Sequence, residues 1–176
     1  DTEGNVVDSW ISGEEPHAVS GLVVGQTYTL TEVTAPEGYA IATAIEFMVE
    51  DNGEIQQIEM TDKQVIVSKK AVTGEEELPG AELTVTDTEG NVVDSWVSGE
   101  EPHAVSGLVV GQTYTLTEVT APEGYAIATA IEFTVEDDGK IQQIEMTDKQ
   151  VIVSKRTITG EEELPGAELT VTDTEG

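Results

Sequence analysis

Short segments in which apolar and polar residues alternate run along the whole chain. They are rich in Val, Ile, Thr and Tyr, and turn residues such as Gly, Pro, Asp and Asn separate them. Alternation with a period of two is typical of half-buried β-strands, and short strands at this spacing are typical of a β-sandwich. No stretch shows a convincing helical period. The pattern therefore predicts an all-β protein of tandem immunoglobulin-like β-sandwiches, with about seven strands in each.

The same segments recur because the sequence is a tandem repeat. The string Asp-Thr-Glu-Gly starts at Asp1, Asp87 and Asp173, and the offsets are equal (87 − 1 = 173 − 87 = 86). A unit of this length can bury its own core and is too long for a stacked solenoid repeat. The two copies differ at only seven positions. Copies this similar indicate equivalent spacers rather than modules with separate tasks.

The repeat and the strand pattern together predict the domain boundaries. We expect a complete sandwich at 65–150, a partial repeat at 1–64 that lacks its first two strands, and the first two strands of a further repeat at 151–176. Turn signals separate the strands of the complete domain. These predicted strands are 65–70, 81–86, 91–97, 103–108, 113–119, 131–136 and 141–148.

The composition narrows the class of partner. There are 36 acidic residues against 7 basic residues, which gives a formal net charge of −29. This charge argues against binding to nucleic acid and to anionic membrane surfaces. There is no cysteine, so the chain has no disulfide and no thiolate metal site. No apolar run is long enough to span a membrane.

No metal or cofactor is expected. The acidic stretches lack the ligand spacing of a calcium loop, and we expect the run 75–77 to be a solvated loop. His17 and His103 have no metal partners at useful spacing and are interpreted as structural histidines. Trp10 and Trp96 end a predicted strand in each copy and are interpreted as packing residues.

Three ionisable residues fall where the strand pattern requires apolar ones. They are Lys69, Glu118 and Asp148, and each continues the inward face of its strand. Their apolar neighbours on those faces are Val65 and Val67, Tyr114 and Leu116, and Ile144 and Met146. Burying a charge costs several kcal/mol unless it is paired or neutralised. The pattern therefore predicts either a buried ion-pair network or a covalent reaction.

The covalent alternative follows from the chemistry of burial. An apolar environment favours the neutral forms of Lys69 and Asp148, and a neutral amine beside a carboxylic acid is a nucleophile beside an electrophile. Glu118 would hydrogen-bond the acceptor and move protons while water leaves. The product is an amide between the two side chains, and the buried charges disappear when it forms.

The stretches VSKKAVTGEEELPGAELTV and YTLTEVTAPEGYAIAT resemble repeats of collagen-adhesin B-type domains and SpaA-type pilins of Gram-positive cell-surface proteins. The resemblance implies a prealbumin-like sandwich with an autocatalytic Lys–Asn or Lys–Asp isopeptide bond. In that family the Lys lies on the first strand, the acceptor on the last and the assisting Glu in the Tyr-x-Leu-x-Glu strand, which here are Lys69, Asp148 and Glu118. Many members use Asn as acceptor, whereas we place the asparagines of this chain in turns or at a strand start.

The resemblance also implies a function. We expect structural stalk repeats of a surface adhesin or pilus-like fibre, which are extracellular and either associated with the cell wall or secreted. The chemistry would be single-turnover self-crosslinking rather than enzymatic turnover. The expected partners are neighbouring repeats, with any host ligand held elsewhere in the parent protein. The alternative is a ligand-binding adhesin module for a host matrix protein or glycan, with an unreacted Lys–Asp–Glu network.

The partial repeats allow two interpretations. The chain is either a window on a longer array, or the tail of one molecule completes the head of the next and generates a filament. In the second case Lys155 would face Asp62 of a neighbouring molecule, with Glu32 assisting, and the joint could become covalent.

Overall fold

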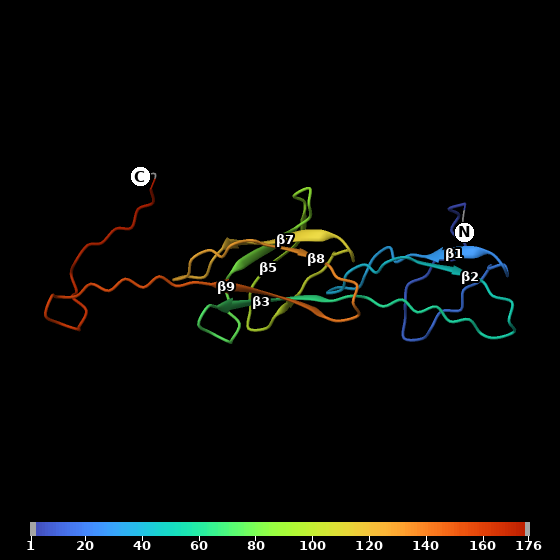
Figure 1. Ribbon diagram of the computed structural model, residues 1–176, viewed down its shortest axis with the longest axis horizontal. Coiled ribbons are helices and arrows are strands. Elements are labelled where there is room, and N and C mark those ends of the chain that lie inside the picture. The colour runs from blue at the N-terminus through green and yellow to red at the C-terminus, as the bar shows by residue number, and fades with distance from the viewer. Residues whose placement is uncertain (1–2, 175–176) are drawn as a thin grey trace.

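The computed structural model describes residues 3–174, and within this range the secondary structure consists of β-strands and contains no helix. The predicted all-β class is therefore confirmed. The chain is elongated, with its two termini at opposite ends and the largest group of strands between them (Figure 1). The strands are β1 Thr27–Leu30, β2 Ile45–Met48, β3 Val65–Ala71, β4 Glu82–Thr86, β5 Val92–Val97, β6 His103–Ala104, β7 Thr113–Thr120, β8 Ile131–Thr134 and β9 Gln142–Asp148.

Strands β3 to β9 form one sandwich of two sheets. One sheet has the order β5-β4-β7-β8 and is antiparallel, whereas the other has the order β6-β3-β9. The pair β3 and β9 is parallel, with Lys69 opposite Met146 and Ala71 opposite Asp148. The first and last strands of the domain therefore lie side by side and run in the same direction. Consequently the chain enters the sandwich at one end and leaves it at the other (Figure 1).

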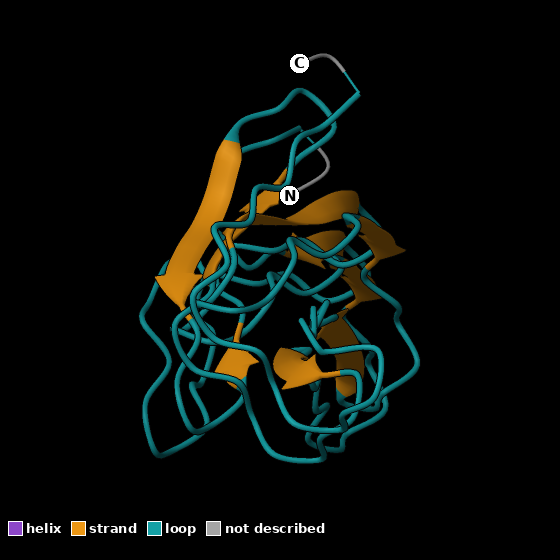
Figure 2. Ribbon diagram, turned by 90° about the vertical axis from the view of Figure 1, so that its left-hand side faces the viewer, coloured by secondary structure: helices purple, strands orange, loops and turns teal. Residues whose placement is uncertain are grey.

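The core lies between the two sheets, and alternate residues of each strand fill it. Strand β3 buries Val65, Val67 and Lys69, and β7 buries Tyr114, Leu116 and Glu118. This period of two is the one that the sequence predicts. Seen along the long axis, the strands are joined by extended loops that make up much of the drawn chain (Figure 2).

One strand of this domain is shorter than predicted. The segment 103–108 was expected to be a strand, but only His103–Ala104 pairs with β3. Val105 and Leu108 are fully buried without being in a strand. Gly107 between them has a φ of 74°, and a Cβ there would lie 3.1 Å from Val93 Cγ1. This left-handed turn against β5 ends the extended run.

The two flanking segments form fewer strands than predicted. In 3–64 the structure contains only β1 and β2, which pair with each other and correspond to β7 and β8 of the complete domain. No strand forms in 151–174, where the nearest feature is an isolated bridge between Arg156 and Glu163. The segment 3–64 has no counterparts of β3 and β4, which are the central strands against which β5, β6 and β9 pair in the complete domain. Without these partners the equivalent segments have no backbone hydrogen bonds to form, so they do not become strands.

Tyr114 provides a first test of the packing. Its hydroxyl accepts a hydrogen bond from the Val109 backbone N–H at 2.9 Å, and burial raises the pKa of Tyr114. We expect Tyr114→Phe to lower the free energy of unfolding by about 1 kcal/mol, because the Val109 N–H loses its acceptor. Urea denaturation measures the change. Tyr125→Phe is the control, since the Tyr125 hydroxyl makes no hydrogen bond within residues 3–174, and an equal loss in both variants would contradict the assignment.

Candidate functional site

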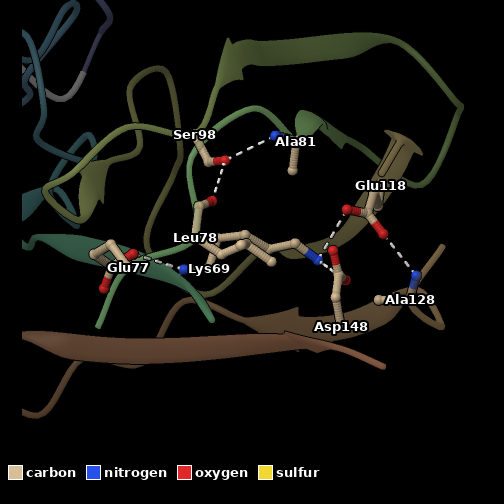
Figure 3. Close-up of polar contacts among 8 residues, drawn as sticks. All are labelled: Lys69, Glu77, Leu78, Ala81, Ser98, Glu118, Ala128 and Asp148. Carbon is tan, nitrogen blue, oxygen red and sulfur yellow. Dashed lines mark hydrogen bonds and ion pairs between the residues drawn. The ribbon is translucent and has the colours of Figure 1, made fainter. Parts of the chain in front are cut away.

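The three predicted inward charges meet in the middle of the sandwich. Lys69 comes from β3 and Asp148 from the end of β9, whereas Glu118 reaches them from β7 of the facing sheet (Figure 3). Lys69 and Asp148 are 1% exposed and Glu118 is 3% exposed. The structure therefore brings together all three members of the set that strand parity selects.

The lysine ammonium lies between the two carboxyl groups. Lys69 Nζ donates a hydrogen bond to Asp148 Oδ1 and lies 3.0 Å from Glu118 Oε1. The other oxygen of Glu118, Oε2, accepts a hydrogen bond of 2.6 Å from the backbone N–H of Ala128. This backbone donor fixes the orientation of the Glu118 carboxyl, so that Oε1 points at the Lys69–Asp148 pair (Figure 3).

One buried oxygen of each carboxyl accepts no hydrogen bond from the described residues, although one of the two, Glu118 Oε1, is ion-paired with Lys69 Nζ. These oxygens are Glu118 Oε1 and Asp148 Oδ2. Burial raises the pKa of Asp148, Lys69 opposes this change, and the neighbouring Glu118 carboxyl raises the pKa further. A proton shared between the two carboxyls would satisfy both oxygens and remove one buried charge. The net direction is an Asp148 that holds its proton more readily than in water.

The backbone at Lys69 is held by a loop that the sequence analysis interpreted as solvated. The Glu77 carboxylate accepts a hydrogen bond from the Lys69 N–H at 2.8 Å, and the Leu78 N–H donates to the Lys69 carbonyl at 2.6 Å. Ser98 Oγ in turn donates to the Leu78 carbonyl and accepts from the Ala81 N–H. Glu77 is therefore a positioning residue for Lys69 that the sequence interpretation missed (Figure 3).

A sequence signal for this loop exists in the repeat. In the C-terminal segment, which has no strands, the Lys155 N–H still donates to Glu163 at 2.9 Å and the Leu164 N–H donates to the Lys155 carbonyl at 2.6 Å. The loop therefore forms from local residues alone. A lysine followed eight residues later by a glutamate is therefore the sequence pattern that predicts this loop.

The second predicted set is only partly assembled. Glu32 Oε2 accepts a hydrogen bond of 2.8 Å from the Ala42 N–H, which matches the contact of Glu118 with Ala128. Burial raises the pKa of Asp62, and the charge of Glu32 and a hydrogen bond to it raise it further. The two carboxyls are therefore close enough to interact, and within residues 3–174 neither is ion-paired with a lysine. Lys155 lies in an exposed segment beyond the complete domain and does not meet them within this chain.

The histidines and tryptophans pack against each other. Trp96 stacks on His103 with a centroid separation of 4.1 Å, and His103 Nε2 lies 3.0 Å from Asp94 Oδ2. Trp10 and His17 repeat this arrangement with Asp8. Within residues 3–174 no cluster of three or more His, Asp or Glu side chains is placed to hold a metal ion. The same range contains no helix that is long and apolar enough to cross a membrane.

The fold and the buried network define a prealbumin-like sandwich at 65–150, arranged around one lysine and two carboxyl groups. The family model described as the SpaA prealbumin-like fold domain matches residues 1–64 and 63–150, and the chain belongs to this family. A comparison with curated protein sequences found no match.

The chain is similar in part to several solved structures, and pilus proteins are among them. The shaft pilin SpaA from Lactobacillus rhamnosus GG is 13% identical, with a TM-score of 0.45, over 73% of this chain and 66% of that chain. The group B streptococcus pilus 2b backbone protein is 17% identical, with a TM-score of 0.46, over 68% of this chain and 52% of that one. The Bacillus anthracis TIE protein is 24% identical, with a TM-score of 0.39, over 72% and 25%. The chain thus spans less than two thirds of the length of these proteins.

Removing the lysine should expose the titration of the buried carboxyl. Lys69→Met removes both interactions that lower the pKa of Asp148, so burial and Glu118 raise it further. A folded pKa above the unfolded value of about 3.9 stabilises the fold below that pH, and the contribution is lost as pH rises through the folded value. We expect the urea midpoint of Lys69→Met to fall as pH rises from about 4 towards neutrality.

The matched control is the double variant Lys69→Met/Asp148→Asn, which lacks this titrating carboxyl and retains every other one. Its urea midpoint should fall less over the same pH range. Identical pH profiles for the single and double variants would show that Asp148 ionises in the folded state as it does in water.

Proposed function

We propose that the chain is a stretch of structural stalk repeats from a cell-surface fibre, in which an amide between Lys69 and Asp148 clamps the domain. The observation that carries the proposal is the buried contact of Lys69 with Asp148, on adjacent parallel strands, with Glu118 against both. Membership of the SpaA prealbumin-like domain family supports a structural role at the cell surface. Neighbouring repeats of the same protein are the partners.

The reaction needs no group beyond the three side chains. The unprotonated Lys69 Nζ attacks Cγ of the protonated Asp148, and a C–N bond forms. Glu118 takes a proton from the attacking nitrogen and delivers it to the departing Asp148 oxygen, so the C–O bond breaks and one water leaves. No electron is gained or lost. The apolar core favours this outcome because a neutral amide replaces a buried ion pair.

The position of the amide gives it a mechanical role. Tension applied along the array enters at Val65 and leaves after Asp148, since β3 and β9 carry the two ends of the domain. With Lys69 joined to Asp148, the force passes through the amide, and residues 70–147 lie outside the load path. By analogy with disulfides, closing a loop of this size adds roughly 4 kcal/mol by restricting the unfolded chain. The larger gain is resistance to forced unfolding, because this resistance depends on the rate of unfolding, which a covalent bond in the load path lowers, rather than on the equilibrium free energy.

The intact mass of the denatured chain tests the clamp. We expect a mass one water below that of the sequence, and a digest in which the peptides of Lys69 and Asp148 are joined. Glu118→Gln should restore the full mass, because the amide side chain cannot carry the proton. Lys70→Ala is the control that should keep the deficit, since Lys70 lies on the outer face and pairs with Glu145 at 3.0 Å.

A full mass for the unsubstituted chain would reduce the three residues to an ion-pair network. A deficit that persists in Glu118→Gln would remove Glu118 from the reaction and leave the clamp itself intact. The two results therefore separate the bond from its proposed assistant.

We further propose that Asp62 and Glu32 accept the Lys155 segment of another copy. The support is the interaction of the Asp62 carboxyl with Glu32, together with the backbone contact that Glu32 keeps with Ala42. The loop that positions the lysine backbone is already formed at Lys155. In a longer array the preceding repeat would supply this segment within one chain.

Head-to-tail joining predicts covalent multimers of the 176-residue chain. At rising protein concentration we expect denatured masses at multiples of the chain mass, less one further water per joint. Lys155→Ala and Asp62→Ala should each abolish the multimers, whereas Lys140→Ala should retain them, because Lys140 is an exposed hairpin lysine. A monomer mass at every concentration would refute the joining of separate molecules and leave the clamp within the domain untouched.

A further inference from the structure

Identical sequences have different exposures in the two copies of the repeat. The stretch Gly-Tyr-Ala-Ile-Ala-Thr occurs at 38–43 and again at 124–129. Ala40 is fully buried and belongs to the core cluster of the following domain, whereas its counterpart Ala126 is exposed. Lys63, which lies in the connection between the repeats, is 6% exposed, whereas its counterpart Lys149 is exposed. Since the residues are the same, the difference comes from what covers them.

The cover is one end of the next sandwich. The Gly38 N–H donates to Ser106 Oγ at 2.9 Å, and the Ile41 N–H donates to the Leu108 carbonyl at 2.8 Å. The Val110 N–H returns a hydrogen bond of 3.1 Å to the Ile41 carbonyl, which makes a short parallel β-bridge between the repeats. These bonds use backbone groups on both sides and therefore fix a register as well as a contact.

An ion pair between Lys63 and Asp138 forms a second part of the same interface. Lys63 Nζ donates to Asp138 Oδ1 in the hairpin between β8 and β9, and Thr43 Oγ1 donates to Asp137 Oδ2 at 3.3 Å. The hydrogen bond from Lys63 is the largest of the effects that lower the pKa of Asp138. A lysine with so little exposure requires a partner. The first copy has Asn52 at the position of Asp138, so the two copies present different partners to a lysine at this junction.

The docking face exists before it is covered. The Ala40 N–H donates to the Lys63 carbonyl at 2.8 Å, and the Ala126 N–H donates to the Lys149 carbonyl at 2.9 Å. Both copies therefore hold the loop against the connecting segment in the same way. In the uncovered copy this leaves an apolar surface that includes Ile127, which is 61% exposed. A preformed surface of this kind loses little conformational freedom on docking.

We propose that residues 38–43 with Lys63 form a docking surface for the next repeat, so that consecutive domains keep one orientation and the array is a stiff rod. The equivalent face, 124–129 with Lys149, takes the corresponding end of another copy of the repeat. The residue at position 138, or at the equivalent position 52 of the first copy, sets the strength of the joint that it forms, because Asp138 forms an ion pair with the lysine and Asn52 cannot. The inference does not depend on the Lys69–Asp148 amide and stands without it.

A distance measurement between the repeats tests the joint. The chain contains no cysteine, so Glu46→Cys and Glu132→Cys, at equivalent exposed positions on β2 and β8, can carry two spin labels. Double electron–electron resonance on the 176-residue chain should give a single narrow distance distribution. Lys63→Ala and Ser106→Ala should each widen this distribution, and Asp138→Asn should widen it less than Lys63→Ala.

The repeat supplies matched controls. Lys149→Ala and Ser20→Ala alter the counterparts of Lys63 and Ser106 that are exposed, and neither should change the distribution. The charge-reversed pair Lys63→Asp/Asp138→Lys should narrow the distribution again relative to Lys63→Asp. Far-ultraviolet circular dichroism checks that each variant keeps its strands. A broad distribution in the unsubstituted chain, or an unchanged one in both Lys63→Ala and Ser106→Ala, would overturn the proposal.

Discussion

A single buried lysine between two carboxyl groups is the constraint on which the domain depends. Lys69 and Asp148 lie on the only parallel pair of strands within residues 3–174, and Glu118 reaches them across the core. Charges in such a place destabilise a fold unless they are paired with good geometry. The backbone N–H of Ala128 and the Glu77 loop supply that geometry from outside the triad. The sandwich therefore places its strands and two of its loops around one buried cluster of a lysine and two carboxyl groups.

The flanking segments show that most strands form only where all the strands of both sheets are present. The sequence of 3–64 repeats that of the complete domain, but only its two mutually paired strands form. Even so, Glu32 keeps its backbone donor and Asp62 lies close enough to Glu32 for the pKa of Asp62 to rise. The interaction between the two carboxyls therefore forms from residues of 3–64 alone, without the complete sandwich. In the complete domain the lysine comes from β3, the strand that 3–64 lacks.

Strand parity located the cluster from sequence because a period of two leaves no choice of face within a strand. Lys69, Glu118 and Asp148 follow directly from that rule. The rule fails where the chain leaves the extended conformation, as at Gly107, and where a loop residue such as Glu77 contacts the backbone of a strand. It also cannot separate Ala40 from Ala126, since their sequence surroundings are the same and only the neighbouring domain differs.

The proposed crosslink and the proposed junction would resist different mechanical loads on one chain. Lys63 at the junction lies two residues before Val65, the first residue of β3, so a force applied at the junction is transmitted directly to β3. From β3 the force would pass into the amide at Lys69. A covalent clamp resists extension of the domain but does nothing against bending between domains. Bending is resisted by the docked face, whose contacts are non-covalent, and by the repulsion of a chain with a net charge of −29. Salt screens exposed charges, and Asp138 is 40% exposed, so the backbone hydrogen bonds of Gly38 and Ile41 should persist at salt concentrations that weaken both the Lys63–Asp138 pair and the surface repulsion.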